Sequence, residues 1–102
     1  MQITDNQVEK ILSMNAGKIW EKYGKRRVYI QIETALNIDV QYYNTGNISS
    51  ASMNGEGISN SKAQKILSGK CFIDLNDENN IVFSEWSSIE LVELLEDYFT
   101  NL

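Results

Sequence analysis

The chain has 102 residues, a net charge of −5, no histidine, no proline and a single cysteine. This length suits one domain with one modest core, and the absence of histidine excludes Ser-His-Asp catalysis, Cys-His catalysis and histidine metal sites. A lone Cys71 excludes an internal disulfide, no apolar run is long enough to span a membrane, and the first residues lack the pattern of a signal peptide, so we expect a cytoplasmic protein.

The first predicted element is a helix over residues 5–15. Thr4 and Gln7 have the spacing of a capping box at its start. Val8, Ile11 and Leu12 form a narrow apolar face, so the helix is expected to pack on the core along that side.

A β-hairpin is predicted over residues 18–32, where two β-rich runs flank Gly24-Lys25. A two-residue loop at that point places Trp20 opposite Tyr29. Ile19, Val28 and Ile30 then share the face that we assign to the core. The other face carries the side chains of Lys18, Trp20, Lys22, Arg27, Tyr29 and Gln31.

The middle of the chain predicts a strand over residues 39–44, a turn over residues 44–47 and a weak, polar strand over residues 48–55. The segment 33–38 is compatible with either a short helical turn or an irregular link, and its sequence does not decide between them. A second helix is predicted over residues 59–69, with Ser59 or Ser61 as its N-cap.

Two short strands are predicted over residues 70–75 and 80–83, joined by a polar turn, and the chain ends in an amphipathic helix. Ser87 is the expected N-cap of this helix, Glu90 would complete a capping box, and Trp86 with Leu91 would form a hydrophobic staple. The expected buried face comprises Ile89, Leu91, Val92, Leu94, Leu95, Tyr98 and Phe99.

These elements predict a single α+β domain over residues 1–102. We expect a mostly antiparallel sheet of four to six strands packed by about three helices. The C-terminal helix is expected to lie across the sheet and to supply most of the core.

The hairpin is a candidate nucleic-acid-binding site. Five of the nine basic residues lie between residues 18 and 27, and lysine and arginine beside aromatic rings are typical of such sites. The alternatives are that Trp20 and Tyr29 pack under the first helix, or that the acidic C-terminal helix neutralises the hairpin. The candidate residues are Lys18, Trp20, Lys22, Lys25, Arg26, Arg27 and Tyr29.

The C-terminal segment is acidic, because no basic residue follows Lys70. Glu90, Glu93 and Asp97 lie on one side of the last helix, with Glu96 beside them. Such a face is usually only solvated, but it can also guide a partner with a basic surface. Our first hypothesis is therefore a non-enzymatic binding protein that occupies a macromolecular partner through this face.

Small acidic inhibitors encoded by phages and mobile elements, anti-CRISPR proteins among them, act in this way on host systems that handle nucleic acid. The chain is similar to them in size and charge alone, and it matches no family motif. Nucleic-acid binding through the hairpin is the alternative function.

A third possibility is calcium binding by residues 74–85, where Asp74, Asn76, Ile81 and Glu85 fit the twelve-residue calcium loop. Asn79 stands where glycine is preferred, and strands rather than helices are predicted on both sides. We therefore favour a polar turn. Nothing else predicts a metal, cofactor or catalytic site, and Cys71 lies in an apolar run typical of a core residue.

Overall fold

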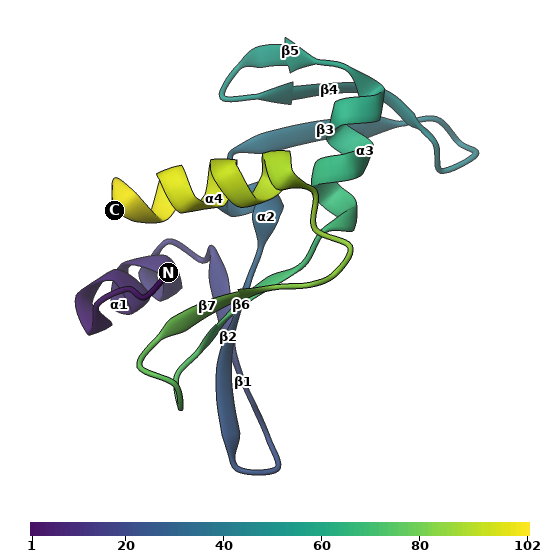
Figure 1. Ribbon diagram of the computed structural model, residues 1–102. Helices are drawn as coiled ribbons and strands as arrows, with labels where there is room; N and C mark the ends of the chain where they lie inside the picture. The colour runs from purple at the N-terminus through teal and green to yellow at the C-terminus, as the bar shows by residue number, and fades with distance from the viewer.

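The computed structural model describes residues 1–102 and contains four helices and two antiparallel sheets (Figure 1). The predicted α+β class is confirmed, with seven strands divided between the two sheets instead of four to six in one. In chain order the elements are α1 (Asp5–Ser13), β1 (Gly17–Lys22), β2 (Lys25–Ile30), α2 (Ile32–Ala35), β3 (Ile38–Tyr42), β4 (Ile48–Met53), β5 (Glu56–Ile58), α3 (Asn60–Ser68), β6 (Cys71–Asp74), β7 (Asn80–Phe83) and α4 (Ile89–Thr100).

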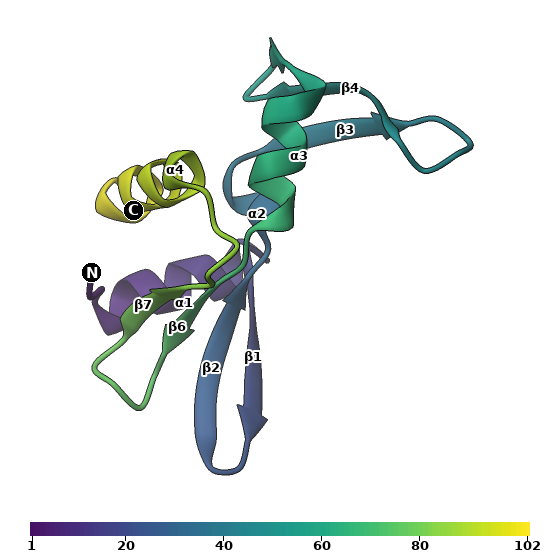
Figure 2. The same ribbon diagram turned by 45° about the vertical axis from the view of Figure 1, so that its right-hand side comes forward.

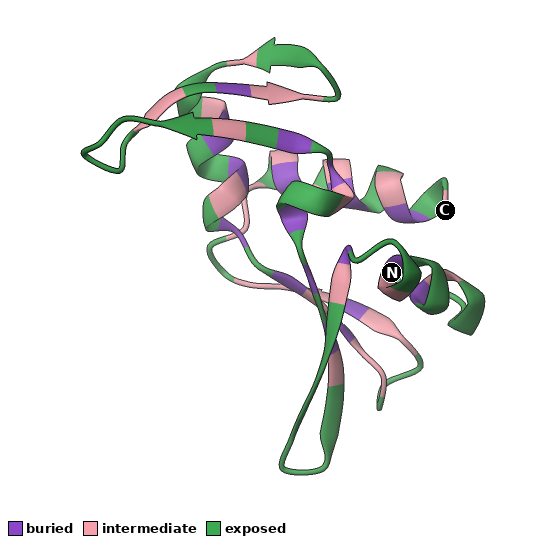
Figure 3. Ribbon diagram, turned by 180° about the vertical axis from the view of Figure 1, so that it is seen from behind, coloured by how far each residue is buried: buried purple, intermediate pink, exposed green.

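The larger sheet has the strand order β1-β2-β6-β7. One of its faces is in the core, since Val28 and Ile73 are fully buried on adjacent strands. Because side chains alternate between the two faces of a strand, their neighbours in sequence lie on the opposite face. The β1–β2 hairpin extends well beyond the other elements (Figures 1 and 2), and its outer half is exposed (Figure 3).

The turn of this hairpin differs from the prediction. Tyr23 and Gly24 occupy the loop, with φ of 54° and 72°, as a type I′ turn requires. Trp20 therefore lies opposite Arg27, and the predicted pairing of Trp20 with Tyr29 is wrong. The error arises because tyrosine rarely adopts a positive φ, so the sequence favoured a loop at Gly24-Lys25. The register moves by two residues, which leaves every side chain on its predicted face.

The smaller sheet, β3-β4-β5, contains a strand, β5, that was not predicted. Asn54 and Gly55, with φ of 53° and 81°, form a second tight turn that returns the chain as β5. Asn-Gly is the preferred pair for such a turn, so a signal for this hairpin is present in the sequence. Helix α3 packs on β4, and the Asn60 side chain donates to the Ile48 carbonyl.

The predicted ends of α1 and α3 are largely confirmed. The Thr4 side chain accepts from the Gln7 main-chain N–H, and the Gln7 side chain accepts from that of Thr4, so the capping box is present. Helix α1 ends at Ser13, two residues before the expected end. Ser59, one of the two expected N-caps, caps α3.

The predicted start of α4 is wrong by one residue. Ser88 is the N-cap, accepting from the Leu91 main-chain N–H at 3.1 Å. Ser87 instead donates to the Lys70 carbonyl at 3.0 Å, which removes it from the cap. The expected staple of Trp86 on Leu91 is also absent, because Trp86 is 70% exposed.

Ile89 does not lie on the buried face of α4, as was predicted. The fully buried stripe is Leu91, Leu95 and Phe99, spaced by four residues. Ile89 lies two residues before Leu91, about 200° around the helix from it, and it is 78% exposed.

A single cluster of sixteen buried apolar residues forms the core. Helix α4 supplies three of them, so the expectation that it supplies most of the core is wrong. The remainder come from the other helices, from the strands and from loop residues such as Ala16. Helix α4 packs against α3 near the junction of the two sheets (Figure 1). None of the four helices is both long and apolar enough to cross a membrane.

Candidate nucleic-acid interface

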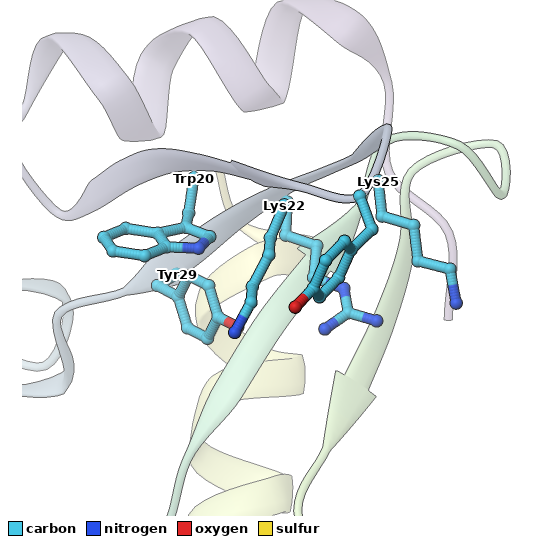
Figure 4. A pocket seen from close by; sticks show the side chains of 6 residues that line it. Trp20, Lys22, Lys25 and Tyr29 are labelled. Atoms are coloured by element: carbon cyan, nitrogen blue, oxygen red, sulfur yellow. The ribbon is translucent and has the colours of Figure 1, made fainter.

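One face of the β1–β2 hairpin gathers basic and aromatic side chains, and we call it the open face. Cross-strand pairing places Lys18 opposite Tyr29, Trp20 opposite Arg27, and Lys22 opposite Lys25. None of these six side chains is buried. Figure 4 shows Trp20, Lys22, Lys25 and Tyr29 projecting to the same side of the strands.

A pocket of about 210 Å³ lies on the open face, lined by Trp20, Lys22, Tyr23, Lys25, Arg27 and Tyr29 (Figure 4). Trp20 is 52% exposed and Tyr29 is 39% exposed, so both rings are accessible from solvent. The alternative in which these rings pack under α1 is wrong, because they lie on the face opposite the buried Val28.

No lysine or arginine of the hairpin forms an ion pair within the molecule. The one ion pair present joins Lys62 of α3 to Glu90 of α4, with 3.1 Å between Nζ and Oε1. No carboxylate of the C-terminal helix is within ion-pair distance of a hairpin lysine or arginine, so the alternative in which that helix pairs with the hairpin is also wrong. The Lys22 Nζ lies 5.2 Å from the centroid of the Tyr23 ring.

Two basic residues differ from their expected positions because of the turn. Lys25, expected in the loop, begins β2 and lies on the open face opposite Lys22. Arg26 points to the other side of the strand, and its main-chain N–H donates to the Asn76 side chain at 2.7 Å. Arg26 is therefore separate from the other candidate residues.

Phe72 of β6 extends the open face and was not predicted from the sequence. It pairs with Tyr29, and the two ring centroids are 5.6 Å apart. The Arg27 guanidinium carbon lies 4.6 Å from the centroid of the same ring, a distance at which cation–π attraction operates. Phe72 is 42 residues and more from the hairpin in sequence, so only the β2–β6 pairing shows that it belongs here.

The acidic residues of α4 form a second surface. Glu93, Glu96 and Asp97 are exposed as predicted, whereas Glu90 is partly engaged by Lys62. Glu93 lies one helical turn after the exposed Ile89, on the same side of the helix. Trp86 is also exposed, just before the helix. The surface therefore combines carboxylates with two apolar side chains, Trp86 and Ile89.

Residues 74–85 form a β-hairpin, as the polar-turn interpretation predicts. Asp74 ends β6, Asn80 begins β7, and the loop between them is not flanked by the helices of a calcium-binding motif. Two of the proposed ligands already accept main-chain hydrogen bonds: Asp74 from the Asn76 N–H at 3.0 Å, and Asn76 from the Arg26 N–H. No three carboxylate or thiol side chains gather anywhere in the molecule.

Cys71 is a core residue with 2% exposure. Burial raises the pKa of its thiol to about 12, because removal from water disfavours the thiolate. The thiol is therefore protonated at neutral pH, and a nucleophilic role would require the thiolate.

Comparisons of the chain with protein-family models, curated proteins and solved structures found no match.

Proposed function

We propose that the protein binds nucleic acid through the open face of the β1–β2 hairpin. The observation that carries this proposal is the convergence of basic side chains that form no ion pair and three accessible aromatic rings on one pocket. Lysine and arginine neutralise phosphates, and aromatic rings stack on bases. Both kinds of contact are available within a few residues of one another.

Because the protein has a net charge of −5, we expect nucleic-acid binding only at the open face. Eight of the fourteen carboxylates follow Lys70 in the sequence. None of them forms an ion pair with a hairpin side chain, although Asp74 of β6 is the register partner of Arg27. The rest of the molecule would repel a polyanion, so we expect a small footprint and a modest affinity that falls as salt is added.

Fluorescence anisotropy of labelled oligonucleotides across a salt series tests the proposal. Four basic side chains lie on the open face, namely Lys18, Lys22, Lys25 and Arg27. If each contacts one phosphate, the slope of log K against log salt reaches about −2.8 for a single strand, from about −0.7 per phosphate. In the Lys22→Ala, Lys25→Ala double variant the slope should become less negative by about 1.4, because two phosphate contacts are lost.

A matched control is the Lys10→Ala, Lys65→Ala variant, which loses the same charge from α1 and α3, outside the open face. Its slope should equal that of the wild type. The proposal fails if no oligonucleotide binds at low salt, or if the control and the hairpin variant weaken binding equally.

A second candidate function is the occupation of a basic macromolecular partner through the acidic surface of α4, as small inhibitors from phages and mobile elements do. The exposure of Trp86 and Ile89 favours it, because exposed apolar side chains with a charged rim are typical of protein interfaces. Affinity capture with the wild type and with a Glu93→Lys, Glu96→Lys variant tests this function. A protein held by the wild type and released by the variant supports it, and identical captured sets contradict it.

A further inference from the structure

We infer that the ligand of the open face is a single strand that places one unpaired base in the pocket, and that this base carries a ring carbonyl, guanine above all. The inference rests on the proposed function and deepens it, because it names the class of nucleic acid and the part of it that the pocket receives.

The shape of the site favours an unpaired base. The pocket of about 210 Å³ is lined by only six residues, and its aromatic rings offer flat faces for stacking. A duplex hides the faces of its bases between neighbouring pairs, and proteins usually reach it with a helix or ribbon inserted in a groove. The open face of the hairpin resembles in this respect the aromatic sheet surfaces that bind single strands.

The pocket has an aromatic end and a cationic end. Trp20 and Tyr29 lie toward the body of the hairpin, whereas Lys22 and Lys25 face each other beside the turn, where the Tyr23 ring also lines the pocket. Figure 4 shows the same order, with Trp20 and Tyr29 on one side and Lys25 on the other. A nucleotide would therefore stack its base on the aromatic end and place its phosphates toward the turn.

Arg27 lines the same pocket as Trp20 and is its register partner across the hairpin, so its guanidinium is within reach of the edge of a base stacked on Trp20. Its guanidinium is held over the Phe72 ring, 4.6 Å from the centroid, which limits the directions in which it can donate. Arginine recognises guanine through the adjacent O6 and N7 acceptors, and this is its commonest contact with a base.

The chemistry of the pocket discriminates against adenine. The three charged residues that line it, Lys22, Lys25 and Arg27, can only donate hydrogen bonds. No carboxylate or amide side chain is among the lining residues, so the tyrosine hydroxyls are the only side-chain acceptors for a base amino group. Adenine presents an amino group where guanine presents O6, and it would place that donor toward other donors.

The test uses a nine-nucleotide strand in which every position is abasic except the centre. Strands with central guanine, adenine or no base carry the same phosphates, so electrostatic attraction is equal among them. We expect guanine to bind about tenfold more tightly than adenine or the base-free strand, with equal salt slopes. DNA and RNA versions are measured in parallel, and this base dependence on either backbone supports the inference.

Three variants locate the effect. Arg27→Lys keeps the charge and should reduce the preference for guanine over adenine to within about twofold. Trp20→Ala should remove the advantage of any base over the base-free strand. Tyr43→Ala is the matched control, since it also removes an exposed aromatic ring but lies outside the open face, and it should bind as the wild type does.

The outcomes separate this inference from the proposed function. Equal binding of the guanine and base-free strands would overturn the single-base inference and leave nucleic-acid binding intact. Tighter binding of a duplex of equal length would overturn it in the same way. No binding of any strand, including a natural one, would overturn both.

Discussion

Gly69 is the position where one added carbon should have the clearest effect on stability. It follows α3 with an ordinary φ of −76°, so alanine meets no backbone restriction there. A Cβ at this position would overlap Cδ2 of Leu91 and would lie 3.3 Å from the Ser87 Cα. Carbon atoms prefer a separation of about 3.5–4.0 Å, so the Leu91 side chain must move.

Leu91 has little room for this movement, because it is fully buried at the start of α4. Overpacking of this kind costs about 1–3 kcal/mol, and the lower entropy of the unfolded alanine variant offsets about 0.4–1 kcal/mol of that cost. We therefore expect Gly69→Ala to lower the free energy of unfolding by up to about 2.6 kcal/mol. For a domain of this size, this corresponds to a melting temperature lower by up to about 20 °C.

Urea denaturation of a double-mutant cycle tests this reasoning. Leu91→Ala alone should cost about 2–5 kcal/mol, but in that background Gly69→Ala should cost nothing, because the clashing methyl is absent. Gly57→Ala is the control, since a Cβ there meets nothing within 4 Å, and it should be neutral or slightly stabilising. An equal cost of Gly69→Ala in both backgrounds would refute the clash with Leu91.

Three further predictions concern single side chains. Trp20→Ala should change the free energy of unfolding by less than about 1 kcal/mol, because Trp20 is 52% exposed. A loss of about 3–5 kcal/mol, typical of a buried tryptophan, would place Trp20 in the core. The pKa of Cys71 is raised from 9.0 to about 12 in the folded state. The protonated thiol therefore contributes its full stabilisation below pH 9. This stabilisation is lost as the pH rises toward 12, by about 1.4 kcal/mol per pH unit. Urea midpoints of wild type and Cys71→Ala between pH 8 and pH 10 should therefore converge, and parallel curves would contradict the shift. Tyr98→Phe should be neutral or stabilising by up to about 1 kcal/mol, since its hydroxyl is buried without a partner, and a clear loss of thermal stability would reveal a hydrogen bond to that hydroxyl.

Local signals in the sequence predicted much of the fold. The capping box at Thr4 and Gln7 located the start of α1, and the alternation along the hairpin assigned the correct face to Trp20 and Tyr29 although the register was wrong. Faces survive a shift of two residues because the strand repeat is also two.

Choices between equivalent neighbours, and contacts distant in sequence, were not predictable in the same way. Ser87 and Ser88 are both able to cap α4, and the hydrogen bond from Ser87 to the Lys70 carbonyl decides between them only after β6 is in place. The position of Phe72 beside Arg27 likewise depends on the pairing of β2 with β6. The absence of ion pairs on the hairpin could not be predicted from composition, because composition says only that acidic and basic groups share one small domain. The complete three-dimensional arrangement is needed to see that no hairpin lysine or arginine forms an ion pair.

The two tight hairpins of the molecule begin their turns with different residues at the same backbone conformation: Asn54 with φ of 53° and Tyr23 with φ of 54°. Asparagine tolerates this conformation, whereas other side chains lose about 1–2 kcal/mol in it. Tyr23 recovers little of that loss by packing, because it is 90% exposed. Directed evolution for heat resistance alone would therefore replace Tyr23 with asparagine or glycine. Selection for nucleic-acid binding would instead retain the Tyr23 ring, which lines the pocket. The two selections would therefore favour different residues at position 23.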